Sequence, residues 1–465
     1  MTDGFIRSDE TAVFPRELDR AYPLIERAEG VWLYGADGKK YLDAAGGGAM
    51  VSSLGNGVEE IVEAAREQAR RISFAYNQQF TSHPQEELAR ALVALAPGDF
   101  ARVHFTSGGA EANEAAVRLA RTYHVDRGEH QRWRIVSPAQ AYHGPTALAL
   151  GLTGRPHLTH PYDPYVVPQL HIPPATSRFD PSGEEALAAL DRALAQHGDE
   201  IAAFFCEPVS AAALPAYSPP DAFWHGLAER RDEHGFLVVF DEVVTGLGRT
   251  GTWFAAEQLP IVPDIITTAK GLGAGYAPVA AVLCRAHVYE AIASGSRLFD
   301  LGHTWNGSPL PCAVGLAVIA YLKRHGLVER VRERGAALRA DLEAALSDCE
   351  TVREVRGRGF LLGVEYADPR DGESFLDRSL GFARRIDVNA LARGLIVYST
   401  QPTPDGYTGD QTLLAPAFTA TDEELDLVVA RMAEAVKATE AELGASLPAR
   451  PSETVEAASG GGFDG

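Results

Sequence analysis

One lysine of this sequence stands where its amine could take part in chemistry. Lys270 closes a predicted strand at 264–268 and is followed by three glycines within 271–275. Partial desolvation at such a strand end lowers the pKa of an amine, and the neutral amine can form a Schiff base with a carbonyl group. The alternative is an ordinary surface lysine. Only five of the 42 basic residues are lysines, and Lys270 is the only one between Lys40 and Lys323, so we favour a functional role.

Two carboxylates close another predicted strand. The apolar run at 236–240 is followed directly by Asp241 and Glu242. Open α/β sheets bind their ligands at the carboxyl ends of the strands, and a protonated ring nitrogen would be a fitting partner for a carboxylate there. A metal ligand or a structural ion pair is the alternative. Because the sequence has no accompanying His cluster, we predict no metal site.

A glycine turn precedes a predicted helix in the segment FTSGGAEANEAA, residues 105–116. Backbone amides at a helix N-terminus point toward a bound anion, and glycine lets the backbone approach it closely. The turn therefore offers an anion site, although an ordinary strand–helix connection would look the same. The residues concerned are Ser107, Gly108, Gly109 and Ala110.

An aromatic residue follows the next predicted strand, in the segment AYHG at 141–144. Tyr142 can present a flat ring face to a planar ligand, with His143 beside it. Tyr and His next to Gly are also common in turns, so this segment gains weight only together with the others.

The elements that must position these residues alternate along the chain. Short apolar strands are separated by segments with helical spacing of apolar residues, which predicts an α/β fold with a mostly parallel central sheet and helices on both faces. Strands are expected at 102–105, 134–137, 201–206, 236–240 and 264–268, and helices at 57–72, 84–96, 109–127, 183–197 and 221–234.

The flanking regions predict a second, smaller α+β domain. We expect an N-terminal arm and hairpin (31–34 with 39–43) at 1–60, packed with the small domain, a large domain at 61–319, the small domain at 320–445, and a disordered tail at 446–465. The elements expected in the C-terminal part are long helices within 310–346, strands at 352–356, 359–366 and 394–398, and a helix at 421–443.

Composition excludes several classes of partner. The chain has 465 residues and a net charge of −21, which disfavours binding to nucleic acid and to anionic membrane surfaces. No apolar run is long enough to cross a bilayer. The N-terminus lacks the features of a signal peptide, and the four widely spaced cysteines indicate reduced thiols, so we expect a cytoplasmic protein.

Together, the anion turn, aromatic plate, strand-end aspartate and strand-end lysine are what pyridoxal 5′-phosphate (PLP) requires. Over roughly residues 20–443 the sequence resembles the class III (omega-type) PLP-dependent aminotransferases of fold type I. The segments that carry the resemblance are SGGAEANEAAVRLAR, YHG, CEPV, DEVVTGLGRTG, KGLGAGYAPVAAV and GHTWNGSP, in that order.

The resemblance implies a role for each matching residue. Lys270 would hold the cofactor covalently and move a proton between the substrate and the cofactor. Asp241 would pair with the pyridine nitrogen, and Tyr142 and Val243 would cover the two ring faces. The residues expected at the phosphate or elsewhere around the cofactor are Ser107, Gly108, Gly109, Ala110, His143 and Glu207.

The resemblance also implies a homodimer with shared active sites, or a tetramer built from such dimers. Thr304 matches the threonine that, in this family, reaches the phosphate bound by the neighbouring subunit. Glu207 matches a glutamate on the substrate side of the ring. The candidate walls of the substrate pocket are Met50, Tyr76, Trp305 and Arg249.

Departures from the family bear on the substrate. Some members carry an arginine near residues 398–418 that grips the substrate carboxylate, but this sequence has no Lys or Arg from Gly394 to Ala430. Gln411 and Leu413 occupy that neighbourhood, and Val244 replaces a polar residue. These departures favour an ω-amino acid, diamine or simple amine as donor, with pyruvate or 2-oxoglutarate as acceptor in a ping-pong reaction.

Three other functions compete with this one. An aminomutase or a decarboxylating transaminase would use the same scaffold. A catalytically silent member would keep the fold, but Lys270 and Asp241 argue against it. A dinucleotide-dependent dehydrogenase is disfavoured because the glycine turn is not GxGxxG.

Overall fold

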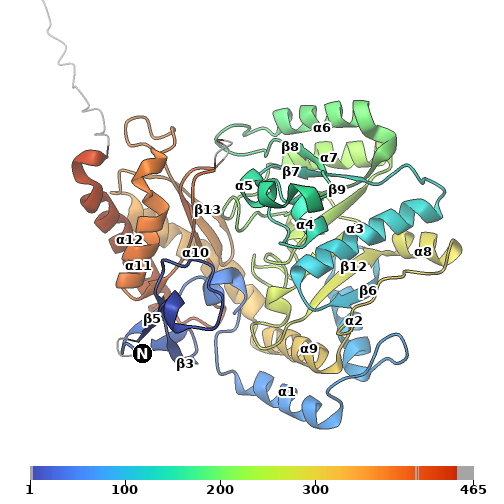
Figure 1. Ribbon diagram of the computed structural model, residues 1–465, viewed down its shortest axis with the longest axis horizontal. Helices are drawn as coiled ribbons and strands as arrows, with labels where there is room; N and C mark the ends of the chain where they lie inside the picture. Colours follow the sequence, from blue (N-terminus) through green and yellow to red (C-terminus); the bar gives the residue numbers. More distant parts are fainter. Residues whose placement is uncertain (1–3, 404–405, 407, 448–465) are drawn as a thin grey trace, which may run out of the picture.

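The computed structural model describes residues 4–403, 406 and 408–447. Figure 1 shows two lobes, one holding the central sheet with its helices and the other holding helices α11 (Phe382–Ala392) and α12 (Asp422–Leu443) beside the N-terminal hairpin. Residues 448–465, most of the tail predicted to be disordered, lie outside the described residues. No helix of the described part is long and apolar enough to cross a membrane.

The central sheet has seven strands in the order β6-β12-β11-β10-β9-β7-β8. All neighbouring pairs are parallel except those made by β12, which runs antiparallel to β11 and to β6. The sheet is therefore mostly parallel, as the alternating pattern predicts. The strands are β6 Phe100–Thr106, β7 Arg134–Pro138, β8 Leu170–Ile172, β9 Ile201–Cys206, β10 Leu237–Asp241, β11 Ile265–Thr268 and β12 Ala280–Arg285.

Helices cover both faces of this sheet. Alternate strand residues point to opposite sides, so that Phe204 and Val238 pack with one group of helices and Phe205 and Val239 with the other. The first group is α2 His83–Leu95, α6 Glu184–His197, α7 Asp221–His234 and α9 Pro309–Arg324, and the second is α3 Gly109–Asp126 and α8 Ala286–Ser294. Two short helices, α4 Ala147–Leu152 and α5 Pro156–Thr159, follow β7.

The second lobe joins the two ends of the chain. A four-stranded sheet, β15-β5-β4-β3, places the C-terminal β15 parallel to β5, with Leu395 opposite Leu42. The other sheet, β13-β14-β17-β16, is antiparallel. The strands and remaining helices are β3 Ile25–Glu29, β4 Trp32–Gly35, β5 Lys40–Asp43, β13 Val352–Arg358, β14 Leu361–Tyr366, β15 Leu395–Ile396, β16 Tyr398–Thr400, β17 Gln411–Leu414, α1 Glu59–Arg71 and α10 Leu327–Leu346, and a separate pair is β1 Phe5–Ile6 with β2 Tyr22–Pro23.

Several elements differ from the expectation. β3 lies in the region expected to be an irregular arm, and the strand expected at 394–398 is divided into β15 and β16, which belong to different sheets. β8, β12, β17 and α11 are not predicted by the local pattern. β8 has only 3 residues, too few for hydrophobic periodicity to identify it. β12 and β17, with 6 and 4 residues, are as long as strands that the pattern predicts elsewhere, so length does not explain why they are missed. The domain boundaries stay a prediction.

Candidate active site

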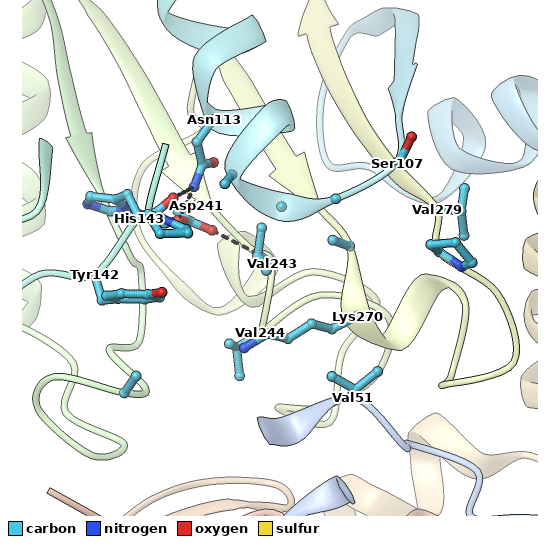
Figure 2. Close-up of a pocket in the computed structure, with 18 of the residues that line it drawn as sticks. Val51, Ser107, Asn113, Tyr142, His143, Asp241, Val243, Val244, Lys270 and Val279 are labelled. Carbon is cyan, nitrogen blue, oxygen red and sulfur yellow. Dashed lines mark hydrogen bonds and ion pairs between the residues drawn. The ribbon is translucent and has the colours of Figure 1, made fainter. Parts of the chain in front are cut away.

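A cavity of about 290 Å³ opens at the carboxyl-terminal edge of the central sheet. It is formed where the segments after β6, β7, β9, β10 and β11 meet, so residues far apart in the sequence face one another. Every residue predicted to contact the cofactor lines this central cavity, except Thr304. Figure 2 shows Lys270 reaching into it, with Ser107 on one side and the group of Asp241, His143 and Asn113 on the other.

Asp241 ends β10 and is held by three hydrogen bonds. Its Oδ2 atom accepts from Asn113 Nδ2 at 2.7 Å and contacts His143 Nδ1 at 2.8 Å, while Oδ1 accepts from the backbone amide of Val243 at 3.0 Å. The side chain is buried. Because Oδ1 has only this one partner, it keeps a lone pair that can accept from a ligand N–H group.

Asn113 is a member of this group that the sequence analysis misses. It is buried on α3, and its Oδ1 accepts a hydrogen bond from Thr267 Oγ1 at 2.7 Å, while its Nδ2 also donates to the carbonyl of His143. One signal was available, because Asn113 lies four residues after Gly109 and therefore faces the same side of the helix.

The start of α3 forms the other end of the cavity. A Cβ atom on Gly109 would lie 2.9 Å from Val243 Cγ1, so only glycine allows the helix to begin this close to that valine. The first amides of a helix have no partner within it and can bind an anion. The Ser107 amide already donates to the Glu111 carboxylate at 2.9 Å, so the amides of Gly109 and Ala110 remain for the anion.

Lys270 lies between the two ends and has an unusual backbone. Its backbone φ of +38° is in the left-handed region. Residues other than glycine rarely adopt this conformation, and where they do it is often at a functional site. Burial lowers the pKa of its amine, and the nearby Asp241 and Glu207 carboxylates oppose this shift. A lowered pKa frees the amine for nucleophilic attack and proton transfer.

Glu207 follows β9 on the side of the cavity next to Tyr142. Its carboxylate accepts from the amide of Ala211 at 3.0 Å, from Ser210 Oγ at 3.3 Å and from the amide of Tyr142 at 3.4 Å. Burial raises the pKa of Glu207, and the negative charge of Asp241 adds to this effect, whereas His143 lowers it. The bonds to Ser210 and Ala211 fix the carboxylate and stabilise the turn that follows Glu207.

Some predicted residues are not brought to this cavity in the single chain. Thr304 and Trp305 are exposed, and Trp305 packs edge-to-face against Phe74 with ring centroids 5.3 Å apart. Tyr76 is half-buried, and Met50 packs in a separate core cluster. Neither Tyr76 nor Met50 lines the cavity, so all four residues stay predictions.

Arg249 requires a correction. It is only 2% exposed and does not line the cavity. Its Nη1 atom donates to the carbonyls of Phe360 and Pro416 at 3.0 and 2.6 Å, and its guanidinium lies over the Phe418 ring. Burial lowers the pKa of Arg249 to about 9, and Asp43 counteracts this shift. The side chain ties the loop after β10 to the second lobe, and we no longer expect it to bind substrate.

Residues not singled out from the sequence complete the walls. Val51 comes from the segment after the glycines at 46–48, Ala212 from the loop after Glu207, and Val279 from the segment before β12. Val244, named in the sequence analysis as a departure from relatives, also lines the cavity. These walls are apolar. Within the described residues, no group of three or more His, Cys, Asp or Glu side chains could hold a metal ion.

The residues of the cavity fit PLP. Asp241 offers a buried acceptor for a protonated ring nitrogen, and Gly109 and Ala110 offer helix-terminal amides for a phosphate. Lys270 lies between Asp241 and these amides, where its amine could react with the aldehyde carbon of PLP. Tyr142 and Val243 lie on different sides of the space that a planar ring would enter (Figure 2).

Comparison with known proteins agrees with this fit. The family described as Aminotransferase class-III matches residues 13–436. The chain is 37% identical over 437 residues to a Bacillus subtilis (strain 168) protein called uncharacterized aminotransferase YodT, covering 92% of this chain and 98% of that protein.

Solved structures show the same fold. A transaminase from the marine bacterium Virgibacillus is 28% identical with a TM-score of 0.89, over 94% of this chain and 99% of that chain. The omega transaminase of Pseudomonas jessenii in complex with PMP is 28% identical with a TM-score of 0.86, over 93% and 97% of the two chains. The chain therefore belongs to the class III aminotransferases, which are PLP-dependent enzymes of fold type I.

Proposed function

We propose that this aminotransferase takes the amino group from an ω-amino acid, a diamine or a simple amine and transfers it to a 2-oxo acid, pyruvate or 2-oxoglutarate, by a ping-pong reaction. The observation that carries the proposal is that no arginine lines the described central cavity. A donor that needs its α-carboxylate held beside the reacting carbon would find no guanidinium there.

The segment around Gln411 and Leu413, where some relatives carry an arginine, supports this choice of donor. Gln411 accepts a hydrogen bond from the buried Arg356, so its amide is engaged away from the cavity. Leu413 is buried in the core cluster that contains Met50. Neither position can supply a positive charge, whereas Glu207 and Asp241 make the cavity favourable for a cationic amine.

Each residue then has a proposed task in the reaction. PLP, when bound, supplies an electron sink and carries the amino group between the two half-reactions. Lys270 holds the cofactor between turnovers and moves a proton at the donor carbon that bears nitrogen. Asp241 keeps the proton on the ring nitrogen, and Tyr142 and Val243 fix the plane of the ring.

The acceptor carboxylate needs a cation from outside the cavity lining. Gly154 accepts a hydrogen bond from the Gln140 amide, which sets Arg155 beside the turn that presents Tyr142. Burial raises the pKa of Tyr398, and the positive charge of Arg155 opposes this shift. Tyr398 therefore lies near Arg155, and the hydrogen bond of Gly154 places Arg155 beside the turn that precedes Tyr142, so we propose that Arg155 stands at the entrance and binds the oxo acid.

A homodimer with shared active sites is part of the proposal, with a tetramer as a further possible assembly. Thr304 is exposed, and the neighbouring Trp305 is 58% exposed, which suits contact with a second copy. We also propose a cytoplasmic location, which suits the four buried, unpaired cysteines.

A donor and acceptor screen tests the proposed reaction. The visible absorbance of the PLP-loaded enzyme is followed while amines are added without acceptor, and then pyruvate or 2-oxoglutarate is added. We expect amines that lack an α-carboxylate to change the spectrum and an oxo acid to restore it. Alanine and glutamate, the amino forms of the two acceptors, should also react by reversal of the second half-reaction, so the donor proposal would be contradicted if only α-amino acids changed the spectrum. Release of carbon dioxide would indicate a decarboxylating transaminase, and isomerisation without acceptor would indicate an aminomutase. No spectral change with any donor would indicate a silent protein.

A further inference from the structure

A second cavity, of about 410 Å³, lies beside helix α10 and shares no lining residue with the central cavity. One wall is α10, another is the end of β13, and the third is the segment after β10 that contains Thr250 and Gln258. We call it the α10 cavity. Three arginines line it, Arg332, Arg339 and Arg358, with a single carboxylate, Glu343.

Close backbone packing brings these arginines together. A Cβ atom on Gly335 would lie 2.4 Å from the carbonyl oxygen of Gly359, and one on Gly251 would lie 2.8 Å from the Cα atom of Arg332. Glycine at Gly335 therefore lets α10 rest on the turn after β13, and glycine at Gly251 lets the segment after β10 rest on α10. Arg332 and Arg339 are seven residues apart, which is two helical turns, so both face this turn.

The arginines are only partly neutralised. Arg339 pairs with Glu343 at 2.8 Å, and both side chains are about half exposed. Arg358 donates from Nη1 to the side-chain oxygen of Gln258 at 3.2 Å, and burial lowers its pKa while Asp221 opposes that shift. In the described part of the chain, no carboxylate lies within ion-pair distance of Arg332 or Arg358.

The charge here runs against the rest of the protein. The chain carries −21 overall, yet the α10 cavity is lined by three positive groups and one negative group. A negatively charged surface repels anions, whereas a local excess of guanidinium groups around a hollow attracts them. Guanidinium groups recognise carboxylate and phosphate oxygens with paired hydrogen bonds.

We propose that the α10 cavity binds a small multivalent anion, one with two or more negatively charged carboxylate or phosphate groups, through Arg332, Arg339 and Arg358. Its size exceeds that of the central cavity, so a molecule larger than inorganic phosphate can enter. The site joins the segment after β10, which begins at Glu242, to the second lobe. Binding does not depend on which amine the enzyme uses.

Calorimetric titration of the PLP-saturated enzyme tests this proposal, with pyrophosphate and citrate as separate probes. Saturation with PLP fills the phosphate position at α3, so binding of a probe there does not contribute, and the variant described next separates the α10 cavity from the substrate entrance. We expect saturable binding of one anion per chain by at least one probe. Stronger binding of pyrophosphate would assign the site to phosphate compounds, and stronger binding of citrate would assign it to polycarboxylates.

The variant R332Q/R339Q provides the decisive comparison, because both side chains are exposed and their loss leaves the core intact. We expect the dissociation constant of the anion to rise about tenfold, as for the loss of charged hydrogen bonds. Arg324→Gln is the matched control, since this exposed arginine on α9 pairs with Glu60 and lies outside the cavity. Absence of saturable binding to the wild type, or equal affinity in R332Q/R339Q, would overturn the proposal.

Discussion

Asn113 and Asp241 are 128 residues apart in the sequence and share a buried hydrogen bond of 2.7 Å between Nδ2 and Oδ2. Thr267 fixes the orientation of the Asn113 amide by donating to its Oδ1 atom, so the amide can only present its N–H group to the carboxylate. The aspartate that is expected to face the cofactor ring is therefore bound by Asn113 of α3, which Thr267 of β11 in turn orients.

Replacement of Asn113 tests this support. In Asn113→Ala, Oδ2 of Asp241 keeps only His143 as a partner, and the carboxylate loses a donor that fixes it. We expect the affinity for PLP to fall about tenfold, corresponding to the loss of one charged hydrogen bond. Fluorescence titration of the apoenzyme measures this affinity. Thr267→Val should produce a smaller loss, and unchanged affinity in both variants would contradict the positioning role.

Lys270→Ala should abolish transamination while the fold survives. Its removal takes away the only lysine amine among the described residues that line the cavity, and we expect turnover to fall by at least about 1000-fold. The visible band of the lysine-bound cofactor should disappear as well. Lys323→Ala, on the helix α9, is the control and should keep wild-type turnover. A Lys270→Ala enzyme that retains both activity and spectrum would exclude the proposed role.

Gly109→Ala should weaken PLP binding by steric conflict alone. The new Cβ atom would lie 2.9 Å from Val243 Cγ1. Overpacking of this kind costs about 1–3 kcal/mol of folding stability, or is relieved by a shift of the helix start that carries the phosphate amides. Gly108→Ala is the matched control, because a Cβ atom there meets nothing within 4 Å. The double variant G109A/V243A should recover part of the lost affinity. Equal effects of the two glycine substitutions would show that the contact with Val243 is unimportant.

Arg155→Gln should raise the KM of the 2-oxo acid and leave the KM of a simple amine donor unchanged. The positive charge of Arg155 is proposed to bind a substrate carboxylate, which the oxo acid has and a simple amine lacks. We expect a rise of about tenfold, measured by steady-state kinetics with each substrate varied in turn. A parallel rise for both substrates would indicate that Arg155 supports the structure instead.

The stability of the protein should fall as the pH rises toward neutrality, in part because of Glu242. Burial raises the pKa of this carboxyl to about 7, above its usual value of 4.5. Between those two values the folded state binds more protons than the unfolded state, so the free energy of unfolding decreases with increasing pH. The full contribution of this group is on the order of 3 kcal/mol.

Glu242→Gln checks this pH dependence. The variant lacks the titrating group, so its melting temperature should change less between pH 5 and pH 7.5 than that of the wild type. The backbone amides of Ala255 and Ala256 and the hydroxyl of Thr245 donate to Glu242, so the variant is expected to be less stable at every pH. The test therefore compares the change of melting temperature with pH in the two proteins, and not their absolute stabilities. Identical slopes would contradict the prediction.

The residues with distinctive chemistry could be found from the sequence. Lys270 stands out because lysines are scarce, Asp241 because it follows a run of five apolar residues, and Gly109 because it begins a helix directly after a strand. Each signal is local, since strand ends and helix starts are set by neighbouring residues. The mostly parallel sheet follows from the same alternation of strands and helices.

Other members of the site could not be found in this way. Asn113 looks like an ordinary helix residue until folding brings it to Asp241, and Val51 reaches the cavity only because the N-terminal hairpin joins the second lobe. Arg249 shows the opposite case. Its position in a motif suggested a substrate contact, but burial and two backbone carbonyls commit its guanidinium to structure.

The sequence by itself determined the class of chemistry, because the residue types and their places at strand ends and helix starts are properties of short segments. Tertiary structure decided which groups support these residues and which arginines remain available to bind a ligand. It directs Arg249 into the protein interior and gathers Arg332, Arg339 and Arg358 around a cavity. Hydrogen bonds and charge interactions depend on distance in space, and only folding sets that distance.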